Sequence, residues 1–176
     1  MSEKVKTLRI EPLSEEHIDY VMSWVNDPEI TFYFASMKKE ITKEEELQFL
    51  KSLIASKDDE VYSVFDEGEY VGQVSINKID WMGEVGRIFL VIAKEKQGNG
   101  YAKLILKSIQ DKAFNEIGLN KLYLIVRPDN AKGIHIYKQC GFDTEGVLRQ
   151  EYKVNDQRFD MKRMSILKED WQTWWK

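Results

Sequence analysis

The middle of the chain reads as strand, glycine-rich loop, helix and strand, and this succession constrains the fold more than any other feature. Gly86–Ala93 is almost wholly apolar, as expected of a strand buried on both faces. A helix follows the loop Gln97–Ala102 and ends at Gly118, and Lys121–Arg127 is a second strand of the buried type. Two strands joined by a helix form a right-handed βαβ unit, so we expect these strands to be parallel.

The flanking segments place this unit in a mixed sheet covered by helices, within a single domain spanning residues 1–176. Alternating apolar residues and turn signals predict further strands at Thr7–Ile10, Val61–Asp66, Glu69–Ile79, Asp143–Leu148 and Arg158–Leu167. Helical spacing predicts helices at Ser14–Val25, at Thr42–Ser56 behind a capping box, and from Asn130 to Gly141. Asn26, Asp27 and Pro28 should end the first helix, and Asn155 and Asp156 should mark the last turn.

Composition narrows the class of protein. The 26 basic and 30 acidic residues give a net charge of −4, which argues against duplex nucleic acid as the main partner. The longest apolar run, Ile88–Ala93, is far too short to cross a membrane, and Met1–Lys6 has no apolar core of a secretory signal. Cys140 is the only cysteine and cannot form an internal disulfide, so we expect a cytoplasmic protein.

The loop Gln97–Ala102 has the composition of an anion site. Several N–H groups at a helix start lack partners within the helix, and Gly98 and Gly100 allow the backbone to curl so that these groups converge. With the helix dipole, they would hold a phosphate or diphosphate. Neither a P-loop nor a dinucleotide fingerprint fits, because Tyr101 and Lys103 stand where those motifs need other residues. A turn that uses glycine for geometry alone is the alternative.

A second motif, Asn130–Phe142, follows the second parallel strand, and together the two resemble the GCN5-related N-acetyltransferase (GNAT) superfamily. The family's diphosphate loop, Gln/Arg-x-x-Gly-x-Gly/Ala, is matched at Gln97, Gly100 and Ala102. The later family segment is matched at Asn130, Gly133, Tyr137, Gly141 and Phe142. The resemblance implies an α/β (α+β) fold with a mixed, mostly antiparallel sheet and a central, splayed pair of parallel strands.

Three stretches make the resemblance more specific. Lys121–Val126, Lys132–Tyr137 and Glu145–Leu148 are most similar to the bacterial spermidine and diamine N-acetyltransferases. Related enzymes that act on ribosomal-protein N-termini or on nucleotide-linked amino sugars share much of the same segment. The resemblance therefore implies a polyamine or diamine acceptor, with a protein N-terminus or an amino sugar as alternatives.

The resemblance also implies direct acetyl transfer from acetyl-CoA to an amine, with no acyl-enzyme and no metal. Tyr137 matches the family's general acid, which would protonate the leaving CoA sulfur. Backbone groups of the strand would pair with the pantetheine amides, and the loop would hold the diphosphate. The residues expected to bind acetyl-CoA are Leu90, Val91, Ile92, Gln97, Gly98, Asn99, Gly100, Tyr101, Ala102, Asn130, Lys132, Gly133 and Ile136.

The base is the point at which the chain departs from the family. Many relatives have a glutamate in the strand before the glycine loop, and Arg87 stands at that position here. Glu84, three residues earlier, is a substitute candidate, and a water chain is the alternative. Arg87 also keeps open a different class of function, a CoA-binding sensor without catalytic activity.

Other conspicuous residues have simpler structural explanations. His17 and His135 are the only histidines, too few for a histidine-rich metal site. The glutamates at 44–46 are most simply solvated charge on a helix, although acids beside an acceptor site would attract polycations. Trp171, Trp174 and Trp175 have helical spacing and should pack on the sheet or on a partner subunit. We expect an oligomer of identical chains, a dimer or larger.

Overall fold

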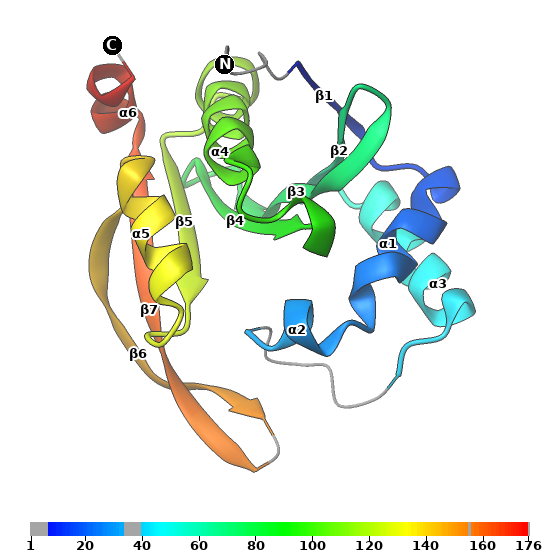
Figure 1. Ribbon diagram of the computed structural model, residues 1–176. Helices are drawn as coiled ribbons and strands as arrows, with labels where there is room; N and C mark the ends of the chain where they lie inside the picture. The colour runs from blue at the N-terminus through cyan, green and yellow to red at the C-terminus, as the bar shows by residue number, and fades with distance from the viewer. Residues whose placement is uncertain (1–6, 34–39, 155, 176) are drawn as a thin grey trace, which may run out of the picture.

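The structure is a computed structural model that describes residues 7–33, 40–154 and 156–175. Its strands form a seven-stranded sheet in the order β1-β2-β3-β4-β5-β7-β6 (Figure 1). The strands are β1 (Leu8–Pro12), β2 (Glu60–Asp66), β3 (Glu69–Asp80), β4 (Val85–Ile92), β5 (Lys121–Val126), β6 (Asp143–Val154) and β7 (Gln157–Leu167). The helices are η1 (Glu15–His17), α1 (Ile18–Val25), α2 (Pro28–Thr31), α3 (Lys43–Ala55), η2 (Lys94–Lys96), α4 (Tyr101–Asp111), η3 (Lys112–Ile117), α5 (Ala131–Gln139) and α6 (Lys168–Trp174).

Strands β4 and β5 are parallel, and the other neighbouring strands are antiparallel. Residues 85–87 of β4 pair with residues 121–123 of β5, and the pairing ends there although both strands continue. The two strands therefore diverge toward their carboxyl ends, as Figure 1 shows. This arrangement confirms the predicted fold class, a mixed and mostly antiparallel sheet around a splayed parallel pair.

Helices bury both faces of the sheet, and β4 contributes to the core on each side. One core cluster includes Ile88 together with Ile105 of α4. The other cluster includes Val91 together with Trp24 of α1 and Leu50 of α3. Because successive side chains of a strand point to opposite faces, only a continuous apolar run can fill two cores. This is the physical reason for the apolar sequence of β4.

The N-terminal helices follow the predicted capping signals, with one addition. The Thr42 side chain accepts a hydrogen bond from the Glu45 N–H, and the Glu45 carboxylate accepts one from the Thr42 N–H at 2.9 Å. The prediction that Asn26, Asp27 and Pro28 end the first helix is confirmed, since α1 ends at Val25 with Asn26 as its C-cap, but a second short helix that was not predicted follows. The Asp27 carboxylate accepts a hydrogen bond from the Glu29 N–H at 2.9 Å, and Pro28 opens the short helix α2. Proline suits the first helical position because its missing N–H needs no partner there.

The β6–β7 hairpin is longer than predicted, since β6 runs to Val154 rather than to Leu148. The extension is largely exposed, so its sequence lacks the apolar alternation of a strand with one buried face. The register shifts between Leu148 and Tyr152, and Gln150 has a φ of 51°. Asn155, which was predicted to mark the turn, lies outside the described residues.

The C-terminal helix α6 packs on the helices rather than on the sheet alone. The Trp171 ring lies 5.4 Å from that of Phe114, and the Trp175 indole donates a hydrogen bond to the Gln110 amide oxygen at 2.7 Å. The buried Gln110 side chain in turn donates to the Cys140 carbonyl at 2.9 Å.

In the described residues, no helix combines the length and apolar character needed to cross a bilayer.

A glycine in β3 permits close approach to β4. A Cβ atom on Gly72 would lie 2.1 Å from the Val91 carbonyl oxygen, so Gly72→Ala must displace one strand. We expect this change to lower the free energy of unfolding by about 2–3 kcal/mol, measured by urea denaturation. Gly68→Ala is the matched control, because Gly68 has a φ of 86° but open space around it, and about 1 kcal/mol is expected. Equal losses in the two variants would contradict this reading of Gly72.

Candidate active site

The open edge of β4 is the first part of the site. Leu90, Val91 and Ile92 pair with β3 on one side, but lie beyond the last residues that pair with β5 on the other. Backbone groups that face the diverging neighbour are therefore available to an extended ligand, which could add to the sheet as a strand does.

The glycine-rich loop lies directly beyond this edge. Gly98 and Gly100 have φ values of 76° and 79°, in the left-handed region that favours glycine. The Gln97 side-chain amide donates to the Ile92 carbonyl at 3.1 Å, which joins the loop to the end of β4. The Asn99 side-chain amide donates to the carbonyl oxygens of Lys96 and Gln97, both at 3.3 Å.

Helix α4 begins with features that suit an anion. Gly100 occupies its N-cap, and no described side chain forms a capping hydrogen bond there. Tyr101 and Ala102 are the first two residues of α4, and no acidic residue lies in its first turn. The N–H groups of this turn and the dipole of the 11-residue helix therefore point toward the loop. The Tyr101 phenol donates to the Asp66 carboxylate at 2.7 Å, so this residue offers the loop its backbone.

Helix α5 positions Tyr137. The Asn130 side chain caps the helix by accepting a hydrogen bond from the Gly133 N–H at 2.9 Å. A Cβ on Gly133 would lie 2.8 Å from the Asn130 side chain, which explains the glycine. Ile136 and Tyr137 pack against the same core cluster as Leu90, whereas Lys132 is exposed. The structure thus brings the tyrosine to the side of the sheet on which Leu90 lies.

The Tyr137 phenol lies in an apolar setting that keeps it protonated. Its ring meets that of Phe142 at 6.1 Å in an edge-to-face arrangement. Burial, with a smaller contribution from Cys140, raises the pKa of Tyr137 to about 12. Its hydroxyl has no hydrogen-bond partner within the described ranges, in contrast to the phenols of Tyr62 and Tyr101, which donate to carboxylates. Tyr137 is therefore a neutral donor available to a ligand.

Glu84 lies away from these groups. It is exposed in the turn before β4, with a φ of 54°, and its carbonyl accepts hydrogen bonds from the N–H groups of Asn120 and Lys121. Leu90 is six residues further along the chain, or about 20 Å for an extended strand. The structure therefore does not bring Glu84 to the end of β4 where the strands diverge.

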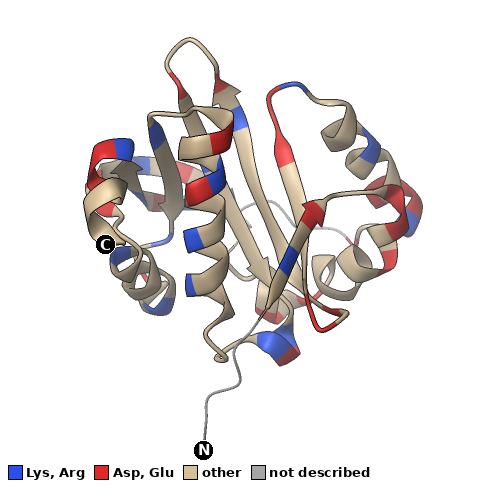
Figure 2. Cartoon of the chain, turned by 90° about the horizontal axis from the view of Figure 1, so that it is seen from above, with Lys and Arg blue, Asp and Glu red and all other residues tan. Residues whose placement is uncertain are grey.

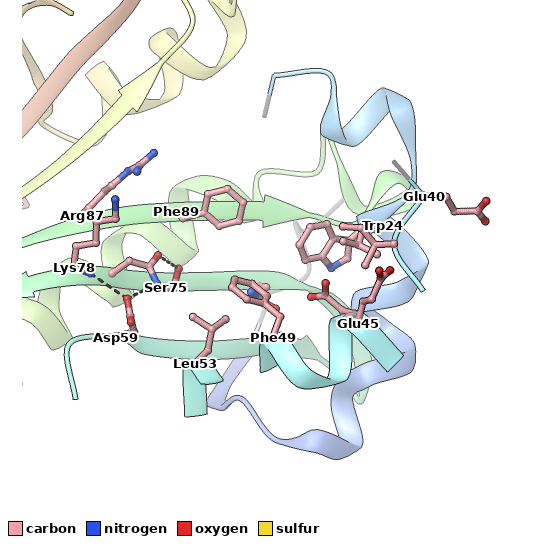
Figure 3. Close-up of a pocket in the computed structure, with 15 residues that line it drawn as sticks. Trp24, Glu40, Glu45, Phe49, Leu53, Asp59, Ser75, Lys78, Arg87 and Phe89 are labelled. Carbon is pink, nitrogen blue, oxygen red and sulfur yellow. Dashed lines mark hydrogen bonds between the residues drawn. The ribbon is translucent and has the colours of Figure 1, made fainter. Parts of the chain in front are cut away.

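A pocket of about 880 Å³ lies on the opposite face of the sheet from Tyr137, between α1, α3, β3 and β4. We call it the α3–β4 pocket. Its wall combines aromatic and acidic side chains with two basic ones, on β3 and β4, and with aliphatic and neutral polar residues (Figure 3). The aromatic residues are Trp24, Phe49 and Phe89, the acidic ones Glu40, Glu45, Glu46 and Asp59, and the basic ones Lys78 and Arg87. Acidic residues gather over α1 and α3 on the right of Figure 2, whereas α4 in the centre carries lysines.

Glu46 is one of several residues of this pocket that the sequence did not predict. Its side chain is buried, and burial raises the pKa of its carboxyl group. It forms no hydrogen bond or ion pair with the part of the chain that the structure describes, although it lines the pocket. The signal was its spacing, because Glu46 lies four residues before Leu50 and seven before Leu53, on the inner stripe of α3. The expectation that the glutamates at 44–46 are all solvated charge is therefore wrong for Glu46.

The chain matches the model of the acetyltransferase (GNAT) domain over residues 7–143. It is 31% identical over 160 residues to the spermidine N(1)-acetyltransferase of Escherichia coli K12, covering 91% of this chain and 86% of that protein. It is 36% identical to the spermidine N(1)-acetyltransferase of Vibrio cholerae, but over 97 residues, or 55% of this chain and 56% of that relative's length.

The fold has a solved counterpart of nearly the same extent. The crystal structure of spermidine N-acetyltransferase from Vibrio cholerae in complex with CoA and spermine superposes with a TM-score of 0.88 at 27% identity. The superposition covers 94% of this chain and 98% of that one. These matches confirm the resemblance stated from the two motifs. The chain therefore belongs to the GNAT family of acetyltransferases, and its enzyme class is N-acetyltransferase with acetyl-CoA as donor.

Proposed function

We propose that this protein transfers the acetyl group of acetyl-CoA directly to a primary amine of a polyamine or diamine such as spermidine. The observation that carries the proposal is the shared strand. Phe89 of β4 lines the α3–β4 pocket, while the backbone from Leu90 to Ile92 forms the open edge. An acceptor in the pocket would therefore meet a donor bound along that edge.

The donor side fits a CoA thioester, which supplies the acetyl group in activated form. The open edge of β4 would pair with the pantetheine amides, and the N–H groups of the loop Gln97–Ala102 would hold the diphosphate. The Gly98 backbone has open space around it, since an added Cβ would meet no atom within 4 Å. The start of α5 would flank the bound CoA on the other side of the site. The Asn130 cap, Lys132 and Gly133 lie there, and Ile136 packs against the core below them.

The acceptor side fits a flexible polycation. Methylene chains pack well on aromatic rings, and ammonium groups bind both carboxylates and the faces of aromatic rings. The α3–β4 pocket offers both kinds of group, with Trp24 and Phe49 near the carboxylates of α3 (Figure 3). The buried Glu46 carboxylate lacks a partner in the described residues, so an ammonium group would supply its missing counter-charge.

The chain's own groups would act at three atoms. A backbone N–H near Leu90 would donate to the thioester oxygen as it gains negative charge. The acceptor nitrogen forms a bond to the carbonyl carbon, and the carbon–sulfur bond breaks. The Tyr137 hydroxyl would donate a proton to the leaving thiolate, whose conjugate acid is the CoA thiol with a pKa of ~8.5, and water would then return a proton to the phenolate. The amine proton leaves to water.

A thiol-release assay with acetyl-CoA and a panel of amines tests the proposal. We expect turnover with spermidine, spermine or putrescine, and little with peptides or nucleotide-linked amino sugars. Turnover confined to peptides or amino sugars would reject the polyamine acceptor and favour the alternative acceptors. Tight CoA binding without turnover on any amine would instead indicate a sensor module.

An assembly of identical chains and a cytoplasmic location stay predictions from the sequence.

A further inference from the structure

Arg87 is the polar side chain that β4 contributes to the wall of the α3–β4 pocket. Two residues of β4 line this pocket, Arg87 and Phe89, and they lie two positions apart on the same face of the strand. Arg87 is also the last residue of β4 that pairs with β5, so its side chain leaves the strand where the gap begins to widen. The donor would lie along the adjoining open edge, Leu90–Ile92, so an amine that reaches it from the pocket would pass Phe89 and lie close to Arg87.

The charge of Arg87 is not neutralised by an ion pair with any described residue. Its Nη2 donates a hydrogen bond to the Tyr152 hydroxyl of β6 at 2.8 Å, and a phenol leaves the charge of the guanidinium in place. A guanidinium stays charged at all ordinary pH values. Arg87 therefore presents a permanent positive charge to the pocket.

The charged groups around Arg87 divide the pocket into two ends. Figure 3 shows Lys78 beside Arg87, with Glu40 and Glu45 at the far end near Trp24. Charged and titratable groups surround Arg87 on every neighbouring element. They are Lys78 of β3, Asp59 before β2, Glu40 before α3, Glu45 and Glu46 of α3, Tyr123 of β5, Tyr152 of β6, and Arg163 of β7, which stacks on Tyr123 at 4.0 Å.

Asp59 is the acidic residue at the basic end of the pocket, and its carboxylate is already hydrogen-bonded to neighbouring residues. Its carboxylate accepts hydrogen bonds from the Asn77 side chain at 3.0 Å, the Lys78 N–H at 3.1 Å and the Ser56 hydroxyl at 2.7 Å. One carboxylate thus faces two cations at this end, which leaves a positive excess there.

We propose that Arg87 keeps the reacting amine in its uncharged, nucleophilic form by repelling the proton of an amine bound beside it. The inference rests on the proposed function and explains how the enzyme works without a carboxylate at this position. A nearby like charge disfavours the protonated form of an amine, and active-site lysines are activated by neighbouring cations in this way. The second amine of the substrate stays protonated at the acidic end, so the same charge pattern orients the substrate. The released proton goes to water before the nitrogen attacks.

Arg87→Met tests the proposal through the pH dependence of kcat with spermidine. We expect the acidic limb of the profile to move to higher pH by about one unit or more, because the bound amine regains its affinity for a proton. At pH 7 kcat should therefore fall about ten-fold or more, and most of the loss should disappear near pH 10. Arg87→Lys keeps the charge and should keep the limb close to its wild-type position.

Lys78→Met is the matched control, since it removes one positive charge from an exposed side chain of the same pocket end. We expect a smaller displacement of the limb than in Arg87→Met. An equal displacement in the two variants would overturn the assignment to Arg87. So would an unmoved limb in an Arg87→Met variant that still binds CoA.

A direct titration supplies a readout that does not depend on turnover. Putrescine labelled with ¹³C next to each nitrogen, bound to the CoA complex, reports the protonation of its two amines by NMR. One amine should titrate at lower pH than in free putrescine, and this difference should vanish in Arg87→Met. Two amines that titrate as in free putrescine would overturn the proposal. A wild-type enzyme inactive on every amine would refute the proposed function itself, and this inference with it.

Discussion

Tyr137→Phe is expected to lower kcat for spermidine by about 100-fold or more while leaving the Kd for CoA within about two-fold. The substitution removes one oxygen that has no partner within the described parts of the chain, so the packing against Phe142 and the core should persist. The loss would come from the leaving sulfur, which no longer receives a proton. Steady-state kinetics and calorimetric CoA titration measure the two quantities.

The raised pKa of Tyr137, about 12, sets the accompanying pH dependence. A phenol with this pKa is protonated throughout the range from pH 6 to 10, so ionisation of Tyr137 should produce no decline of kcat on the basic side of that range. Tyr20→Phe, at an exposed tyrosine of α1, is the control and should retain wild-type kcat. Wild-type kcat in Tyr137→Phe would exclude the residue as the acid.

Glu46→Gln is expected to weaken spermine binding about ten-fold or more and, at the same time, to stabilise the free protein. Spermine binding weakens because the substitution removes the negative charge that would pair with an ammonium group. The stabilisation follows from the raised pKa of the buried carboxyl, because ionising this group in the folded state is costly. Calorimetry measures the affinity, and thermal unfolding measures the stability.

The sign of the stability effect depends on pH. A carboxyl whose pKa is higher in the folded state contributes stability below its unfolded pKa of ~4.3, and this contribution is lost as the pH rises through the folded value. Glu46→Gln should therefore raise Tm by about 2–4 °C at pH 7.5 and give no gain near pH 4. Glu44→Gln makes the same charge change at an exposed neighbour and should alter neither quantity. Unchanged spermine affinity in Glu46→Gln would refute the assigned role.

Sequence patterns predicted the central part of the fold because its signals are local. The apolar run of β4, the glycines of the loop and the Thr42 capping box each express a requirement of the backbone where they stand. The exposed end of the β6–β7 hairpin and the short helix α2 were missed for the opposite reason. Neither buries a regular stripe of side chains, so hydrophobic periodicity could not reveal them.

The candidate site was predictable to a different extent on its two sides. The donor side is built from two short motifs, so motif spacing was enough to predict Leu90–Ile92 and Gln97–Ala102 in the first and Tyr137 in the second. The acceptor pocket joins α1, α3, β3 and β4, and its charge pattern exists only after folding. For that reason the sequence predicts Glu46 as solvated charge, whereas the structure buries it, and predicts Glu84 as a substitute base, whereas the structure places it in the turn before β4.

The setting of Cys140 determines which labelling chemistry this chain allows. It is fully buried, and burial raises the pKa of its thiol to about 11, so little of the reactive thiolate forms at neutral pH. Disulfide reagents such as dithiobisnitrobenzoate will therefore report released coenzyme with almost no background from the enzyme. Because the sequence has no other cysteine, one engineered on the β6–β7 hairpin would accept a fluorophore or spin label selectively without removal of the native residue.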